Sequence, residues 1–268
     1  GHDHSDREGG GLLAAMKTCP ETRPMTAKRN PKQEGTDYFD CIPQIGPCPI
    51  GCNQCFYNRP GAYYVPIDQP HVPTPEEVGN GIVRMNCGND SNNQRDLVIA
   101  TAQRYKRFFF NTSIHNLDFP GPVVLTANPR EESPAWVPTF ADEAPRNLMF
   151  VRLRVSGTNL RLIDEAVRRW TQGGVPVVLT FMAYYDREPR VSEEVHNDIG
   201  GPDQCYEWRV RHVNSYWCPT RLFMWYVLNR YRDNRLVSMC SSLNSGYCRD
   251  CRNCETYYIQ TMKRTRGE

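Results

Sequence analysis

A strand–helix–strand unit between residues 148 and 182 limits the fold of this chain more than any other feature. Leu148 to Val155 and Val175 to Met182 are apolar, strand-like runs. Between them, apolar residues recur at helical spacing from Asn159 to Gln172, where Asn159 can cap the helix and Gly173-Gly174 can end it. Because strands joined by a crossover helix lie parallel in one sheet, the unit predicts an α/β fold with a parallel sheet.

Strand-like and helical runs also occur on both sides of this unit. Thr74-Pro75-Glu76-Glu77 predicts a helix start, with Thr74 as the N-cap and Pro75 at the first helical position. Residues 186–216 are polar and have no regular spacing, which predicts an irregular connection. The other predicted elements are strands at 37–45, 108–113, 122–126 and 235–239, a strand from Ile82 that ends in the turn 87–91, and helices at 92–106 and 221–230.

Composition limits the partners and the compartment. A formal charge of +2 with interspersed signs gives no support for a nucleic-acid partner. The longest apolar run, Val175 to Tyr185, is far shorter than a bilayer span, and the N-terminus has no apolar signal core. We therefore expect a cytoplasmic protein without a membrane partner. The 268 residues include 21 prolines and 19 glycines, which predicts long loops in one large domain or one domain with an appendage.

Twelve cysteines are many for a cytosolic protein, where clustered thiols usually indicate metal rather than disulfides. Cys48, Cys52 and Cys55 form a C-x3-C-x2-C loop that can direct its thiolates at one centre. Iron–sulfur clusters are normally held by four cysteines, so a local set of three would leave one iron open to a substrate. A structural zinc site, which needs four ligands, and disulfides or unrelated thiols remain as alternatives.

A second cysteine group lies near the C-terminus: Cys240, Cys248, Cys251 and Cys254. Four thiolates can complete an iron–sulfur cluster or a zinc site, and thiols that share no metal are the third possibility. Cys218 is a possible substitute ligand. The scattered cysteines are expected to be small buried hydrophobic residues, and they are Cys19, Cys41, Cys87, Cys205 and Cys218.

The cysteine loop, placed directly after a strand-like run, resembles the signature of the radical S-adenosylmethionine (radical SAM) superfamily. The resemblance covers about residues 37–239 and implies an α/β fold, namely a partial (β/α)6 TIM-like barrel. Residues 1–36 are then a flexible N-terminal arm, and 240–268 a small cysteine-rich C-terminal extension that resembles the auxiliary-cluster segments of the family. One departure from the family is Gln54, which stands before the third cysteine where an aromatic residue is usual.

The resemblance also implies the residues that bind S-adenosylmethionine. A carboxylate or amide after the second strand would bind its ammonium group, although residues 87–91 can equally be an ordinary turn. A polar residue at the end of the strand 148–155 would contact its ribose or carboxylate, unless that side of the strand is a solvated outer face. The residues so assigned are Phe56, Tyr57, Asn89, Asp90, Arg154, Ser156 and Thr180.

The function implied by the resemblance is reductive cleavage of S-adenosylmethionine at a [4Fe-4S] cluster, giving a 5'-deoxyadenosyl radical that abstracts hydrogen from a substrate. An external one-electron donor, flavodoxin- or ferredoxin-like, would supply the electron, and the C-terminal cysteines would hold a second, auxiliary [4Fe-4S] cluster. A peptide substrate is slightly favoured over a nucleotide or another small molecule. The alternatives are a non-catalytic zinc protein and an activase that installs a radical on a partner enzyme.

Overall fold

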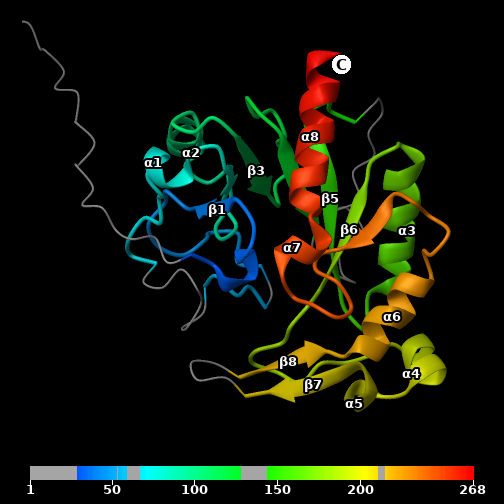
Figure 1. Cartoon of the computed structure of the whole chain (residues 1–268). Helices are drawn as coiled ribbons and strands as arrows, with labels where there is room; N and C mark the ends of the chain where they lie inside the picture. Colours follow the sequence, from blue (N-terminus) through cyan, green and yellow to red (C-terminus); the bar gives the residue numbers. More distant parts are fainter. Residues whose placement is uncertain (1–28, 53, 59–66, 128–143, 211–214) are drawn as a thin grey trace, which may run out of the picture.

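The computed structural model describes residues 29–52, 54–58, 67–127, 144–210 and 215–268. Its centre is a seven-stranded sheet in the order β1-β2-β3-β4-β5-β6-β9, in which every neighbouring pair is parallel (Figure 1). The predicted α/β fold with a parallel sheet is confirmed. Among the described residues β1 and β9 do not pair with each other, so the sheet is open. Its strands are β1 (Tyr38–Cys41), β2 (Ile82–Met85), β3 (Phe108–Thr112), β4 (Val123–Ala127), β5 (Leu148–Val155), β6 (Val177–Phe181) and β9 (Val237–Met239).

The helices connect the strands or cover the sheet. Thr74 caps α1 (Pro75–Val78) through a reciprocal capping box with Glu77, as the sequence predicted. A separate antiparallel hairpin is formed by β7 (Tyr206–Arg209) and β8 (Tyr216–Pro219). The helical elements are η1 (Pro31–Gln33), α1 (Pro75–Val78), α2 (Arg95–Ala102), α3 (Leu160–Gln172), α4 (Glu193–Ile199), α5 (Pro202–Cys205), α6 (Arg221–Asn229), α7 (Cys248–Cys251) and α8 (Asn253–Arg266).

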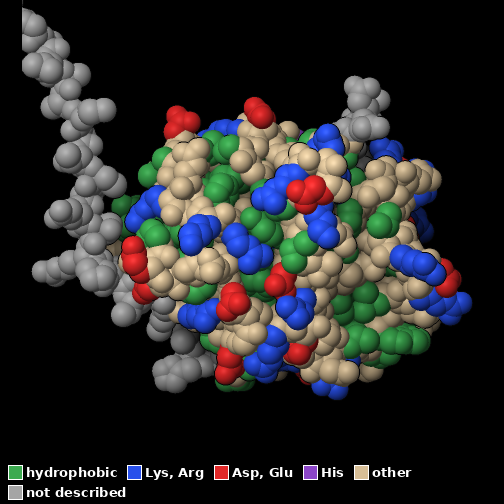
Figure 2. All heavy atoms as spheres, turned by 45° about the horizontal axis from the view of Figure 1, so that its top comes forward, with side chains coloured by type: hydrophobic (Ala, Val, Ile, Leu, Met, Phe, Trp, Pro, Cys, Tyr) green, Lys and Arg blue, Asp and Glu red, His purple; other side chains and the backbone are tan. Residues whose placement is uncertain are grey.

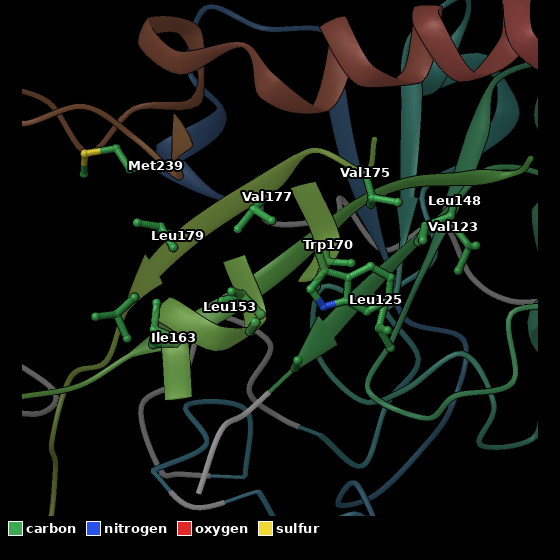
Figure 3. Close-up of a cluster of buried hydrophobic side chains, with 14 of the residues drawn as sticks. Val123, Leu125, Leu148, Leu153, Ile163, Trp170, Val175, Val177, Leu179 and Met239 are labelled. Carbon is green, nitrogen blue, oxygen red and sulfur yellow. The ribbon is translucent and has the colours of Figure 1, made fainter. Parts of the chain in front are cut away.

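One face of the sheet is covered by α2, α3 and α6, and this side contains the larger core. Ile163 and Trp170 of α3 are buried and lie over Leu125 and Leu153 of the sheet (Figure 3). The spacing of the apolar residues in α3 explains the contact, because residues three and four apart share one side of a helix. The strands beneath are apolar on this face, as expected for a parallel sheet buried under helices.

The opposite face, which we call the α8 face, carries a smaller apolar cluster. Ile82, Phe109 and Val124 belong to it, and Tyr258 of α8 packs on them. Figure 1 shows α8 lying across the sheet beside β5. The end of the helix is held where the Arg264 guanidinium donates hydrogen bonds to the carbonyl oxygens of Leu148 (2.5 Å) and Arg146 (3.0 Å). The C-terminal segment therefore packs directly on the central sheet.

Three details differ from the sequence-based expectation. Residues 186–216 are not wholly irregular, because they include α4, α5, β7 and the first residue of β8. Asn159 does not cap α3 with its side chain; its amide bonds the backbone of Ser156 and Arg154 instead. Of the predicted arm, residues 1–28 lie outside the described residues, whereas η1 packs against β1 and buries Gln33.

On the face shown in Figure 2, basic and acidic side chains are interspersed. Within the described ranges, no helix is both long enough and apolar enough to cross a bilayer.

Candidate metal and cofactor site

The predicted site residues meet at the edge of the sheet where the parallel strands end. The chain runs from β1 into the cysteine loop at 48–55, and β2 ends in the turn at 86–91. β1 and β2 are neighbours in the sheet, so these two segments lie next to each other. Open α/β sheets bind their ligands at this carboxyl edge.

The loop brings the cysteine side chains together. Cys48 and Cys55 both pack against the small cluster of Ile42 and Tyr57. The pKa of the Cys48 thiol is raised to about 11, chiefly by burial and in smaller part by the nearby Cys52 and Cys55 thiols. The Asn58 side chain fixes the start of the loop by bonding the backbone N–H (2.9 Å) and carbonyl (3.2 Å) of Cys48. Asn53 lies outside the described residues.

Gln54 connects this loop to β5 and to the segment that follows β6. It is buried, with a left-handed backbone at φ 53°. Its side-chain oxygen accepts a hydrogen bond from Tyr185 N (2.8 Å), and its side-chain nitrogen donates to the Asp186 carboxylate. Its carbonyl accepts one from the Arg154 guanidinium (3.3 Å). The cysteine loop is thereby attached to β5 and to the segment that follows β6.

The two aromatic residues after the third cysteine lie in different environments. Phe56 is 45% exposed, whereas Tyr57 is buried. The Tyr57 ring rests directly on Gly88 of the turn after β2, where a Cβ atom would lie 2.3 Å from the ring. Gly88 therefore allows the loop to seat on the turn. Both aromatic residues stay predicted cofactor contacts.

In the turn after β2, Asp90 is fully engaged within the protein. Its buried carboxylate accepts hydrogen bonds from Ser113 N (2.6 Å), Thr112 Oγ1 (2.8 Å) and Asn92 N (2.9 Å). These bonds attach the turn to β3. The neighbouring Asn89 interacts with the Tyr57 hydroxyl, but its buried side-chain nitrogen makes no hydrogen bond of good geometry to any described residue. Of Asn89 and Asp90, only Asn89 therefore has a side-chain N–H that could donate a hydrogen bond to a ligand.

Arg152 and Arg154 of strand β5 are both half-buried and lie on the same face of the sheet. Arg154 is half-buried, and the charge of its guanidinium lies near the Cys52 and Cys55 thiols. The alternative that this side of the strand is a solvated outer face is therefore wrong. Thr180 of β6 is opposite Arg154 in register, and its buried hydroxyl oxygen has no hydrogen-bond partner among the described residues. Ser156 is buried beyond the strand end, where its hydroxyl lies 3.2 Å from that of Thr158.

The C-terminal cysteines form a second group on the α8 face. Burial raises the pKa of the Cys248 thiol to about 11, and the Cys240, Cys254 and Cys251 thiols, which lie nearby, act in the same direction. Cys240 directly follows β9, and α7 carries Cys248 and Cys251. Cys218 is placed on β8 of the hairpin, paired with Glu207. Of the cysteines expected to be buried, Cys41 and Cys205 are buried, Cys87 and Cys218 are half-buried, and Cys19 lies outside the described residues.

A polar layer on the α8 face lies beside both cysteine groups. Each residue of the layer follows, by two positions in the same strand, an apolar residue of the cluster under α8. Because side chains of a strand alternate between its faces, the layer lies on the same face as that cluster. Its residues are Asp40, Arg84, Asn111, Thr126, Arg152 and Thr180. Arg152 donates hydrogen bonds to the neutral Asn111 (3.4 Å) and Thr126 (3.3 Å). Asp40, which accepts from Arg84 at 2.7 Å, supplies a carboxylate.

The charges of this layer suit anionic metal clusters. Among the described residues, no three Cys, His, Asp or Glu side chains are arranged so that they could hold a metal ion as they stand. The thiols nevertheless gather in two groups, and arginines face each: Arg154 the loop thiols, Arg84 and Arg152 the Cys254 thiol. Partly buried cations require anions nearby, and thiolates bound to metal supply them. The residues present therefore fit clusters held by cysteine thiolates.

Sequence reasoning missed several residues of this arrangement. Asp40 and Arg84 were not singled out, although alternation from Tyr38 and Ile82 places them on one face of neighbouring strands. The connecting role of Gln54 had no signal in the sequence, because its partners are at least a hundred residues away.

Comparisons with known proteins give no relative for this chain: no protein-family model matches it, and no curated protein or solved structure does.

Proposed function

We propose that this chain is a radical SAM enzyme in which Cys48, Cys52 and Cys55 hold a [4Fe-4S] cluster with one open iron. One observation carries the proposal: the three-cysteine loop stands at the carboxyl edge of a sequentially ordered parallel sheet, and Arg154 of β5 faces its thiols. Three thiols from one loop suit a cluster that leaves an iron for an outside ligand. The sheet order, which never reverses, supports the reading of the fold as a partial (β/α)6 barrel.

The cofactor would lie between the loop and the polar strand ends. When bound at the open iron, S-adenosylmethionine would supply the chemistry: one electron from the external donor would split its sulfonium into methionine and a 5'-deoxyadenosyl radical able to abstract hydrogen from a substrate. Asn89 and Thr180 each offer a buried polar atom without a hydrogen bond to the described residues, and an unsatisfied polar atom favours a ligand that bonds to it. Arg154 offers a cation for a carboxylate. Tyr57 and Gly88 close the loop against the turn and exclude water from one side.

The tail group, which is Cys240, Cys248, Cys251 and Cys254, is proposed to hold a second [4Fe-4S] cluster. Four thiols complete such a cluster without an open position, so its proposed role is electron transfer. A reducing compartment such as the cytoplasm fits a protein that needs free thiols at both groups. A flavodoxin- or ferredoxin-like donor would supply electrons, and a peptide is our preferred substrate class.

The decisive experiment is to reconstitute the protein anaerobically, reduce it in the presence of S-adenosylmethionine and assay 5'-deoxyadenosine. We expect Cys52→Ala to lower the yield at least a hundredfold, because it removes one of the three loop ligands, while the tail metal stays bound. Cys218→Ala, on the hairpin, is the matched control and should retain the yield.

Two other results would redirect the proposal. Colourless protein with stoichiometric zinc would support the non-catalytic zinc protein. Intact clusters that give no 5'-deoxyadenosine would count against the enzyme, and an activase would in addition form a stable complex with the protein it modifies.

A further inference from the structure

The buried ion pair of the polar layer is held from one side. Arg84 of β2 is 9% exposed, and its Nε donates to Asp40 Oδ1 at 2.7 Å. The Asp40 carboxylate also accepts hydrogen bonds from the amides of Gln33 (2.6 Å) and Asn30 (3.4 Å). These contacts hold the carboxylate in place and position the guanidinium through it.

The other side of the guanidinium points at the tail cysteines. Arg84 Nη1 lies 3.9 Å from Cys248 Sγ. The Cys254 and Cys87 thiols are also within its electrostatic range. Arg84 therefore contacts Asp40 through Nε and the Cys248 thiol through Nη1, which lie on different edges of the planar guanidinium. Because the pair is buried, its charges are screened less than on the surface.

We propose that Arg84 raises the reduction potential of the iron–sulfur cluster held by the tail cysteines, with Asp40 as the residue that positions it. The inference rests on the second cluster of the proposed function. Reduction adds one negative charge to a cluster, and a buried cation beside a ligand sulfur stabilises that charge. Net charge and hydrogen bonds to the sulfurs are among the properties that set such potentials. Asp40 offsets part of the effect because its charge is opposite.

The test isolates the tail cluster in the full chain. Cys48, Cys52 and Cys55 are replaced together by Ala, the protein is reconstituted anaerobically, and the midpoint potential is measured by a redox titration followed by electron paramagnetic resonance. Arg84→Gln removes the charge but leaves Asp40 buried without its partner, so Asp40→Asn and Asp40→Asn/Arg84→Gln are compared as a second pair. Arg168→Gln, on the exposed side of α3, is the control.

We expect Arg84→Gln to decrease the equilibrium constant for reduction about tenfold, which equals 59 mV for one electron. Arg84→Lys should retain most of the potential, because it keeps the charge. Asp40→Asn should raise the potential, and the double variant should lie below Asp40→Asn by the same factor. Arg168→Gln should leave the potential unchanged.

The inference and the proposed function fail in different ways. An intact tail cluster whose potential does not change on Arg84→Gln, whether Asp40 is present or replaced by Asn, would overturn the inference alone. Zinc at the tail cysteines would overturn both the inference and the second cluster. Failure of the unmodified protein to cleave S-adenosylmethionine would leave the measured potentials, and so this inference, standing.

Discussion

At the scale of single residues, Gln54 fixes the cysteine loop through polar contacts. The radical SAM pattern that the sequence resembles has an aromatic residue at this position, whereas Gln54 is an amide with hydrogen bonds to Tyr185 and Asp186. The segment that contains them continues toward the hairpin, where Tyr184 bridges Trp217 and the Tyr185 ring lies 5.4 Å from that of Tyr216. The position of the cysteine loop is therefore coupled to the hairpin.

We predict that Gln54→Ala lowers the free energy of unfolding by about 1–3 kcal/mol, because it removes the hydrogen bonds that the buried Gln54 amide makes to Tyr185 N and to the Asp186 carboxylate. Urea denaturation of the metal-free protein measures the loss, and iron content after reconstitution should fall with it. Gln204→Ala, at an exposed glutamine of α5, is the control. Equal stability of the two variants would show that the links contribute nothing.

Gly88 illustrates a second residue-scale constraint. We expect Gly88→Ala to destabilise the protein by about 1–3 kcal/mol, because a Cβ at 2.3 Å from the Tyr57 ring forces the loop off the turn. Thermal denaturation should show the loss, and Tyr57→Ala in the same protein should relieve part of it. Gly246→Ala, where a Cβ meets nothing within 4 Å, should have little effect. A normal melting temperature for Gly88→Ala would contradict the packing described here.

At the scale of elements, α8 separates the α8 face of the sheet into two parts. It covers the apolar residues of this face, and the polar layer lies beyond it, beside α7 and the ends of the strands. The ring of Tyr257 lies 5.3 Å from that of Phe150, and Asn253 bonds the carbonyl of Met239 at 2.8 Å. The helix thus holds the tail cysteines close to Arg84.

Arg264 holds the far end of this helix. We predict that Arg264→Ala lowers the free energy of unfolding by about 1–3 kcal/mol, because it removes hydrogen bonds from a charged group to two backbone carbonyls. Its effect should extend to the tail: metal content there should decrease while 5'-deoxyadenosine formation at the loop is retained. Arg266→Ala, at an exposed position of the last turn, is the control. If Arg264→Ala retains the tail metal, the hydrogen bonds at this end of α8 do not influence metal binding by the tail cysteines.

At the scale of the whole molecule, the two cysteine groups lie beside one polar layer of a single sheet, the loop group at its carboxyl edge and the tail group on its α8 face. The loop group is reached from β1 and the tail group from β9, which are the outer strands of the sheet. Chain segments that are about two hundred residues apart are therefore brought beside the same polar layer. This arrangement is what allows one charged face to serve both groups.

The packed core also makes stability depend on pH. Burial raises the pKa of the Cys41 thiol to about 12 from an ordinary value of 9.0. Above pH 9 the thiol ionises in the unfolded chain but stays protonated in the folded one, so the free energy of unfolding falls as pH rises toward 12. Each unit in that window costs about 1.4 kcal/mol for this thiol.

Urea denaturation of the unmodified protein and of Cys41→Ala at about pH 8 and pH 10 checks this expectation. The stability advantage of the cysteine should be smaller by about 1 kcal/mol at about pH 10, since only the thiol has a proton to lose. Groups common to both proteins cancel in the comparison. An advantage that is the same at both pH values would mean that Cys41 ionises alike in the folded and unfolded chain.

The sequence by itself determined the features that depend on neighbouring residues. The strands and the helix between residues 148 and 182 follow from local periodicity, as does the capped start of α1. The loop thiols could be assigned to one group because their spacing lets a short loop bring them together. Short elements such as β7 and β8 could not be predicted, since a strand of four residues depends on its partner rather than on its own pattern.

Only the tertiary structure decided what surrounds the two cysteine groups. That Arg84 meets Cys248, that Gln54 meets Asp186, and that α8 covers one face of the sheet are contacts between segments far apart in the chain. Such contacts arise from the joint packing of all strands and helices, and local spacing contains no record of them. The two groups of thiols could therefore be identified from the sequence, whereas the charged side chains beside them were found only in the folded structure.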